Sequence, residues 1–245
     1  MATFVLTDAT SWVAGHDFTA DSNELSLSLE VDEQENTTFG GGGYRSRLGG
    51  LRNVEAELSG YWQSATSAAV DPQVFSNLGT ADEVVTTSPT GVAGATAYFA
   101  QMGKFSYELF GSLGEVTPFS LSMMGTNGVG AVRGQVAKAK GNVSATGQLG
   151  SILTDLSSND QVSSTQFLYA AFHVFTAGTT ITVLLESDDS AGFASPTTRA
   201  TIGPITTTGG TWMTRVAGPI TDTHYRFNVS AITGTFSVAG AIAIQ

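Results

Sequence analysis

Hydrophobic and polar residues alternate along much of this chain with a period of two. In residues 25–31, leucine and valine occupy every second position, and serine or glutamate fills the positions between them. The same alternation returns in residues 54–58, 105–109 and 116–124. Because successive side chains of a strand point to opposite faces, this period indicates half-buried β-strands. The pattern predicts an all-β protein.

The later part of the chain also predicts strands, over residues 168–175, 181–186, 225–229 and 235–244. Residues 168–175 are apolar on both faces, which indicates a central strand. Turns are expected at glycine-rich points, among them Gly203-Pro204. Short strands at this spacing are typical of a β-sandwich.

One short helix is predicted over residues 71–78. Asp71 can cap its first turn, Pro72 suits the first helical position, and Gly79 can end it.

Small and polar residues fill the segment 137–164. We expect this segment to separate two domains. We expect an N-terminal domain over residues 1–147, a linker over 148–164, and a C-terminal β-sandwich over 165–245. The chain length is ample for two cores.

The segment 36–51 is the most unusual stretch, because six of its sixteen residues are glycine. Glycine loses the most backbone freedom on ordering, so we expect this segment to form neither a helix nor a packed strand. Strands are predicted on both sides, which makes it the long tip of a hairpin. We interpret it as an arm that becomes ordered on a neighbouring copy of the protein. A plain flexible loop is the alternative.

The amino-acid composition narrows the range of possible functions. The chain has 21 acidic and 10 basic residues, a net charge of -11, and no cysteine. Disulfides and thiolate metal sites are therefore excluded. The acidity disfavours binding to nucleic acid or anionic membranes, and it suits either simple solubility or the wall of a passage through which DNA slides. The opening residues lack the pattern of a secretion signal and no apolar run could span a bilayer, so we expect synthesis in a cytoplasm.

No motif predicts catalysis or a cofactor. The histidines, His16, His173 and His224, are scattered and are best interpreted as strand or turn residues. A weak calcium site is conceivable where Glu186, Asp188 and Asp189 share one turn, although a hairpin with solvated acids fits that stretch better. We expect no enzyme activity.

Four features follow one another in the first half: a short strand with a turn over residues 13–19, the segment 37–40, a basic glycine-containing stretch over 45–51, and the short acidic helix. In order and spacing they resemble the N-terminal domain of major tail tube proteins of long-tailed (siphovirus-type) bacteriophages. That family implies a β-sandwich with a helix beside it, six copies in a ring, and rings stacked into a tube. The long loop contacts the neighbouring ring. The second domain resembles β-sandwich modules at the ends of phage tail proteins.

The resemblance implies a structural virion protein, made in the cytoplasm of a bacterial host, that conducts DNA during ejection without binding it specifically. Its expected partners are further copies of itself and the tape measure, tail tip and terminator proteins. The residues expected to contact another copy are Phe39, Gly40, Gly41, Gly42, Gly43, Tyr44, Arg45, Arg47, Leu48 and Arg52. Their expected acidic partners on that copy are Glu30, Asp32, Glu33 and Glu35.

Two other function classes stay open at this point. A capsid decoration or tail fibre protein would also be rich in strands, but it would form trimers or remain monomeric. A carbohydrate-binding module would present Trp62 or Trp212 on an exposed platform.

Overall fold

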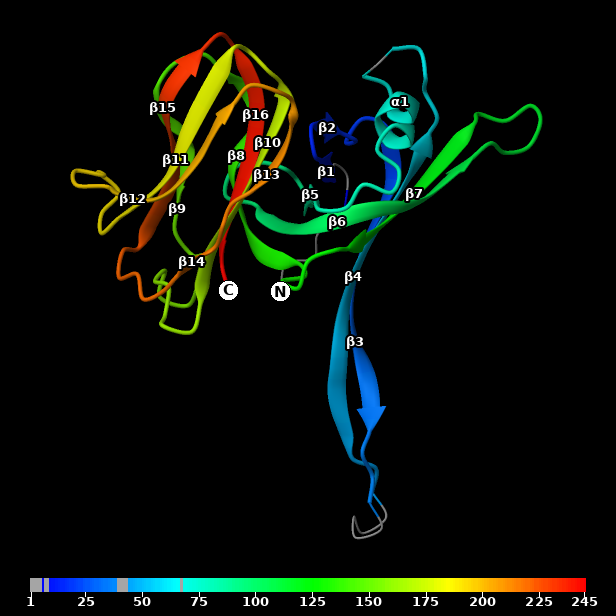
Figure 1. The fold of residues 1–245 in the computed structure, drawn as a ribbon, viewed down its shortest axis with the longest axis horizontal. Coiled ribbons are helices and arrows are strands. Elements are labelled where there is room, and N and C mark those ends of the chain that lie inside the picture. Colours follow the sequence, from blue (N-terminus) through cyan, green and yellow to red (C-terminus); the bar gives the residue numbers. More distant parts are fainter. Residues whose placement is uncertain (1–5, 7–8, 39–43, 67) are drawn as a thin grey trace. The chain divides into compact units, whose positions relative to one another are not determined.

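The computed structural model describes residues 6, 9–38, 44–66 and 68–245. The prediction of an all-β fold is confirmed (Figure 1). The chain divides into two compact units. The larger unit comprises residues 1–21, 83–101 and 132–245, and the smaller comprises residues 22–82 and 102–131.

The larger unit is built from strands of both halves of the sequence. In chain order they are β1 (Thr10–Val13), β2 (His16–Asp17), β5 (Glu83–Ser88), the first part of β6 (Thr96–Leu109), β8 (Val132–Val143), β9 (Gly147–Leu153), β10 (Phe167–Thr176), β11 (Thr180–Asp188), β12 (Thr197–Ile205), β13 (Gly209–Trp212), β14 (Val216–Ala217), β15 (His224–Thr233) and β16 (Phe236–Ile244).

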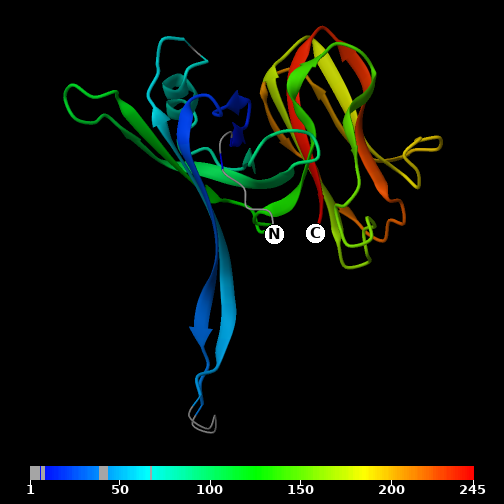
Figure 2. The same ribbon diagram turned by 180° about the vertical axis from the view of Figure 1, so that it is seen from behind.

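Residues 132–245 fold into a two-layered sandwich (Figures 1 and 2). One layer has the strand order β12-β11-β15-β9, and the other contains β13-β10-β16-β8. Alternate residues from both layers meet in one apolar core, where the rings of Phe172 and Phe227 pack edge to face with centroids 5.6 Å apart. The central position predicted for residues 168–175 is confirmed, because β10 lies between β13 and β16 and is buried from Leu168 to Val174.

The division between the units differs from the expected boundary at residues 148–164. The expected linker begins with β9, which is paired with β15, and its buried residues Leu153, Leu156 and Val162 belong to the sandwich core. Strand β8, which we assigned to the first domain, pairs with β16. The small polar residues of this segment fit a strand because close backbone packing, as at Gly150, leaves no room for larger side chains.

The prediction of a turn at Gly203-Pro204 is wrong. Both residues lie inside β12, at a β-bulge opposite Ile181 and Val183. Strand β12 is the edge of its sheet, so a proline there removes no ladder hydrogen bond that the sheet requires.

The smaller unit is an antiparallel sheet with one short helix. Its elements are β3 (Ser22–Glu35), β4 (Arg47–Tyr61), α1 (Val70–Phe75), the second part of β6 and β7 (Pro118–Gly125), and the strands lie in the order β3-β4-β7-β6. One face of the sheet is apolar and buried: Leu58 of β4 lies opposite Leu121 of β7, and both are fully buried.

The predicted helix is present, but Asp71 does not cap it. The helix begins one residue earlier than expected, with Ala69 at the N-cap and no side-chain cap. Asp71 lies in the first turn and accepts a hydrogen bond from the Tyr107 hydroxyl at 3.2 Å. Burial, and then the Asp71 carboxylate, raise the pKa of Tyr107, so its hydroxyl stays protonated and ties α1 to β6.

A buried histidine links the sandwich of the larger unit to that unit's N-terminal strands. The ring of His173 on β10 makes two hydrogen bonds of 2.8 Å, one to the Ala14 carbonyl through Nδ1 and one to the Thr86 hydroxyl through Nε2. Nδ1 must donate to the carbonyl, and in the neutral ring Nε2 then accepts from the hydroxyl. Burial is the largest cause of a His173 pKa lowered to about 4; the Ala14 hydrogen bond and the Asp17 charge oppose it.

Acid should weaken this link. The pKa of His173 lies near 6.5 in the unfolded chain and near 4 in the folded chain. Between these values only the unfolded chain binds the proton. The contribution of His173 to the free energy of unfolding is therefore fully present above pH 6.5 and falls as the pH drops towards 4. The slope is up to about 1.4 kcal/mol per pH unit. Urea titrations from pH 7 to pH 4 should show a steeper loss for the wild type than for His173→Gln. Parallel losses in the two proteins would contradict this role.

Candidate functional site

The candidate site is an arm formed by β3 and β4 where they run past the rest of their sheet (Figure 1). Strand β7 pairs with β4 only from Glu55 to Tyr61. Beyond that point β3 and β4 pair only with each other, so we define the arm as residues 30–53. The six residues on its β3 side, residues 30–35, extend about 20 Å at the usual rise of a strand. An isolated two-stranded ribbon is only marginally stable in water.

Residues 47–51 form part of β4, so the expectation that they would not pack as a strand is wrong. They pair with β3, and the two glycines lie at a register shift, where Val31 faces Arg52 but Glu33 faces Gly49. This is a β-bulge on β4. A Cβ atom at Gly50 would lie 3.0 Å from Cβ of Asp32, so glycine suits this close approach of the strands.

Two of the predicted arginines already have partners in their own chain. The Nε atom of Arg47 lies 2.6 Å from Oε1 of Glu33, and Nη1 of Arg45 lies 3.6 Å from Oε2 of Glu35. Glu33 and Glu35 are therefore paired within their own chain, and their pairing with arginines of another copy stays a prediction. Antiparallel pairing places these residues diagonally across one face of the ribbon, within reach of long side chains.

The other predicted arm residues fall into two groups. Phe39, Gly40, Gly41, Gly42 and Gly43 lie outside the described residues. Tyr44, Leu48 and Arg52 are exposed, as are Glu30 and Asp32. Within the described residues Arg52 makes no ion pair, so it is the arginine of the arm that is left to contact another molecule.

The arm carries apolar side chains that its own chain does not cover. Leu51 is 80% exposed and Tyr44 is 84% exposed, and Val31 and Leu48 are each more than half exposed, as is Leu29 just before the arm. Strand β3 pairs with β4 alone among the described strands, so its outer edge leaves backbone N–H and C=O groups without strand partners. A long apolar edge strand of this kind is a template for pairing with another chain.

The sheet of the smaller unit has a second face, which is polar and acidic. We call it the acidic face; the register of β3, β4, β7 and β6 assigns to it Glu24, Ser26, Ser28, Glu55, Glu57, Ser59, Ser106, Glu108, Ser120 and Ser122, with Met124 at its edge. The Ser122 hydroxyl donates a hydrogen bond of 3.1 Å to Glu55 across the strands. No lysine or arginine aligns with this face in the part of the sheet that the structure describes.

Sequence reasoning did not find the acidic face as a unit. The alternation of serine and glutamate was visible in each strand, but only the register shows that four polar stripes lie side by side. No helix among the described residues is long and apolar enough to span a membrane.

The weak calcium prediction is wrong. Glu186 is buried and bound to Arg226 at 2.9 Å and to Asn228 at 3.0 Å. Asp188 accepts hydrogen bonds from the backbone N–H groups of Ser190 and Ser195, which outweigh the effect of burial and hold its pKa below the usual value. The described residues contain no group of three or more His, Asp or Glu side chains that could hold a metal.

The tryptophans do not form an exposed platform. Trp212 is half-buried between the rings of Phe99 and Tyr169, at centroid distances of 5.5 Å and 6.2 Å. Trp62 is half-buried near Phe110. These positions are those of packing residues.

Comparisons with known proteins give weak likenesses only. No family model and no curated protein matches the chain. Among solved structures, one chain in the virion of a native gene transfer agent particle has a TM-score of 0.41 and 16% identity, over 51% of this chain and 95% of that one. A chain in the tail of an empty gene transfer agent particle, refined with C6 symmetry, has a TM-score of 0.37 and 16% identity, over 45% and 82%.

A third likeness is to the Dit protein of SPP1, described as a paradigm of the hub adsorption apparatus in phages that infect Gram-positive bacteria. Its TM-score is 0.36 at 10% identity, over 98% of this chain and 100% of that one. The three TM-scores are too low to carry an argument about fold or function.

If the apolar side chains of the arm serve contacts outside the monomer, removing them should not destabilise it. The double variant Leu48→Ser and Leu51→Ser should change the free energy of unfolding by no more than about 0.5 kcal/mol, as is usual for exposed positions. The control Leu58→Ser, in the buried part of the same strand, should cost about 3 kcal/mol. Urea titrations of the purified monomer measure both. A large loss in the arm variant would mean that these leucines belong to the monomer's core.

Proposed function

We propose that this protein is a structural component of a phage tail, which polymerises as stacked hexameric rings into the tail tube. The observation that carries the proposal is the arm: a ribbon with exposed leucines, an unpaired edge and a free arginine requires a neighbour. The resemblance of the first half of the sequence to tail tube proteins specifies that neighbour as another copy. A head-to-tail contact of this kind, repeated along an axis, makes a filament.

In a tube, the open edge of β3 and the acidic face of the smaller unit would each have a definite position. The open edge of β3 would pair with a strand of the adjacent copy, which leaves no free edge when the ring closes. The acidic face would line the lumen, because carboxylates and hydroxyls without cations repel the DNA backbone and do not retain it. The sandwich of residues 132–245 would face the outside of the tube. Tape measure, tail tip and terminator proteins are the expected partners at the tube ends.

Shortening the arm tests the proposal. Val31 and Arg52 lie directly opposite each other, so residues 32–51 can be replaced by Asn-Gly, the preferred two-residue hairpin turn. Electron microscopy of the concentrated wild type should show rings or hollow tubes, and the shortened protein should show dispersed monomers with an unchanged circular dichroism spectrum. Tubes from the shortened protein would exclude the arm as the assembly element. Wild-type monomers or trimers would contradict the tube and favour a decoration, fibre or sugar-binding protein.

Reversing a charge on the acidic face tests the lumen assignment. Glu57 is exposed at the centre of that face, and Glu57→Lys should leave tube formation intact but make the tubes bind DNA at low salt. The matched control is Asp189→Lys, which makes the same charge change at an exposed position of the sandwich. DNA that co-sediments with the Glu57 variant alone, and is released by salt, is the expected result. Equal DNA binding by the two variants would contradict a luminal acidic face.

A further inference from the structure

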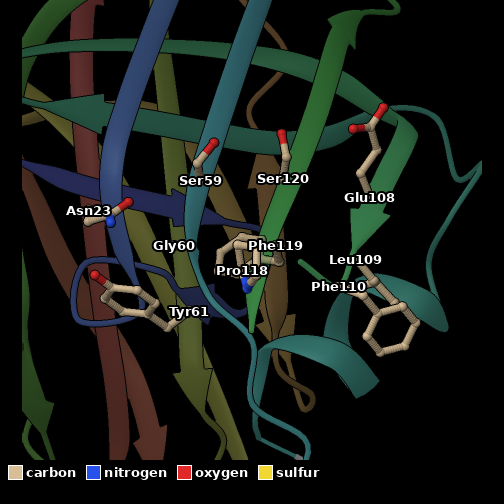
Figure 3. A pocket seen from close by; sticks show the side chains of 10 residues that line it. All are labelled: Asn23, Ser59, Gly60, Tyr61, Glu108, Leu109, Phe110, Pro118, Phe119 and Ser120. Atoms are coloured by element: carbon tan, nitrogen blue, oxygen red, sulfur yellow. The ribbon is translucent and has the colours of Figure 1, made fainter. Parts of the chain in front are cut away.

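The sheet of the smaller unit has a pocket at the end opposite the arm. Strand β4 begins in the arm at Arg47 and ends at Tyr61, and Tyr61 lines a cavity of about 370 Å³. In Figure 3 the rings of Tyr61 and Phe110 flank Pro118 at the end of the strands, with Glu108 on the sheet beside them. One strand therefore carries a protrusion at one end and a cavity at the other.

The pocket has a polar side, where Ser59, Glu108 and Ser120 of the acidic face line it, and an apolar side beside an exposed apolar turn. Phe110, Leu113 and Val116 belong to the turn between β6 and β7, and each is strongly exposed. Together with Tyr61 and Pro118 they give this end of the sheet an apolar surface. Three large apolar side chains in one exposed hairpin turn serve no purpose in the monomer and mark a contact site.

The pocket end and the arm end of the sheet carry complementary charges. Glu108 lines the pocket and is exposed, and Glu115 lies in the adjacent turn. No lysine or arginine occurs between residues 105 and 132, and neither acid has an ion pair among the described residues. At the other end, Leu51 and Arg52 are neighbours in the sequence, and Arg52 has no ion pair among the described residues.

We propose that this pocket receives the arm of another copy of the same chain: Leu51 enters between Tyr61 and Phe110, and Arg52 pairs with Glu108. The assignment rests on the proposed function and adds the receiving surface to it. Leu51 supplies an apolar side chain for the rings of Tyr61 and Phe110, and its neighbour Arg52 supplies a cation for Glu108. Since the two surfaces lie at opposite ends of one sheet, the contact is head-to-tail and can repeat along an axis.

Charge reversal tests the pairing. Arg52→Glu and Glu108→Arg should each raise the protein concentration needed for tube formation about tenfold, because like charges then meet at every contact. The double variant should return to within about threefold of the wild type if the two residues form a pair. Glu57→Lys is the control on the same face outside the pocket, and it should assemble normally. Independent effects, with no recovery in the double variant, would overturn the pairing.

Cross-linking gives a second test that does not depend on polymer yield. The chain contains no cysteine, so single cysteines report only the intended contact. Leu51→Cys protein mixed with Phe110→Cys protein should form disulfide-linked dimers under mild oxidation. Leu51→Cys mixed with Asp189→Cys should not. Tubes from the wild type without the Leu51 to Phe110 cross-link would overturn the pocket assignment and leave the tube intact, whereas a wild type that forms no rings or tubes would overturn both.

Discussion

A two-stranded ribbon in water cannot bury its own apolar side chains, and this constraint governs the protein. The arm extends beyond the sheet that anchors it, with leucines exposed and one edge without a strand partner. Its internal ion pairs, such as Arg47 with Glu33, are exposed to solvent and contribute on the order of 1 kcal/mol or less each. They set the register of the ribbon more than they stabilise it. In the proposed function, the missing stabilisation comes from a surface of another copy of the chain.

The same strands perform two tasks because their side chains alternate. In β4, the inner half buries Val54, Ala56 and Leu58 in the core, and Glu55 and Glu57 between them face away. The outer half has no layer behind it, so both of its faces are open. A single strand thus anchors the unit, contributes to an acidic surface and presents the arm. Because one strand performs all three tasks, its residues follow a specific pattern, even though the chain has no predicted catalytic or metal motif.

The strands themselves followed from the sequence, because a period of two in residues 25–31 or 54–58 depends only on which face is buried. The structure of the glycine-rich segment was harder to predict from the sequence. Gly49 and Gly50 indicated conformational freedom, but in the structure they lie at a bulge, where a Cβ atom at Gly50 would come within 3.0 Å of Asp32. The pairing of Arg47 with Glu33 in one chain could not be predicted without the register, since these residues are far apart in sequence.

The larger unit was harder still to predict. The small and polar residues of β9 indicated a linker, and β8 was assigned to the first domain. Only their pairing with β15 and β16 makes these strands part of the sandwich. The hydrogen bond from His173 to Ala14 joins residues far apart in the sequence, and no local motif marks it. Tertiary contacts of this kind override local propensity.

The central claim is that the arm is completed by another copy of the chain. An electron cryomicroscopy map of polymers grown from the purified protein tests it most directly. The account predicts a hollow tube in which each arm lies on a subunit of the adjacent ring and the acidic face lines the lumen. A map in which each arm folds back on its own subunit, or in which the acidic face lies outside the tube, would contradict the account.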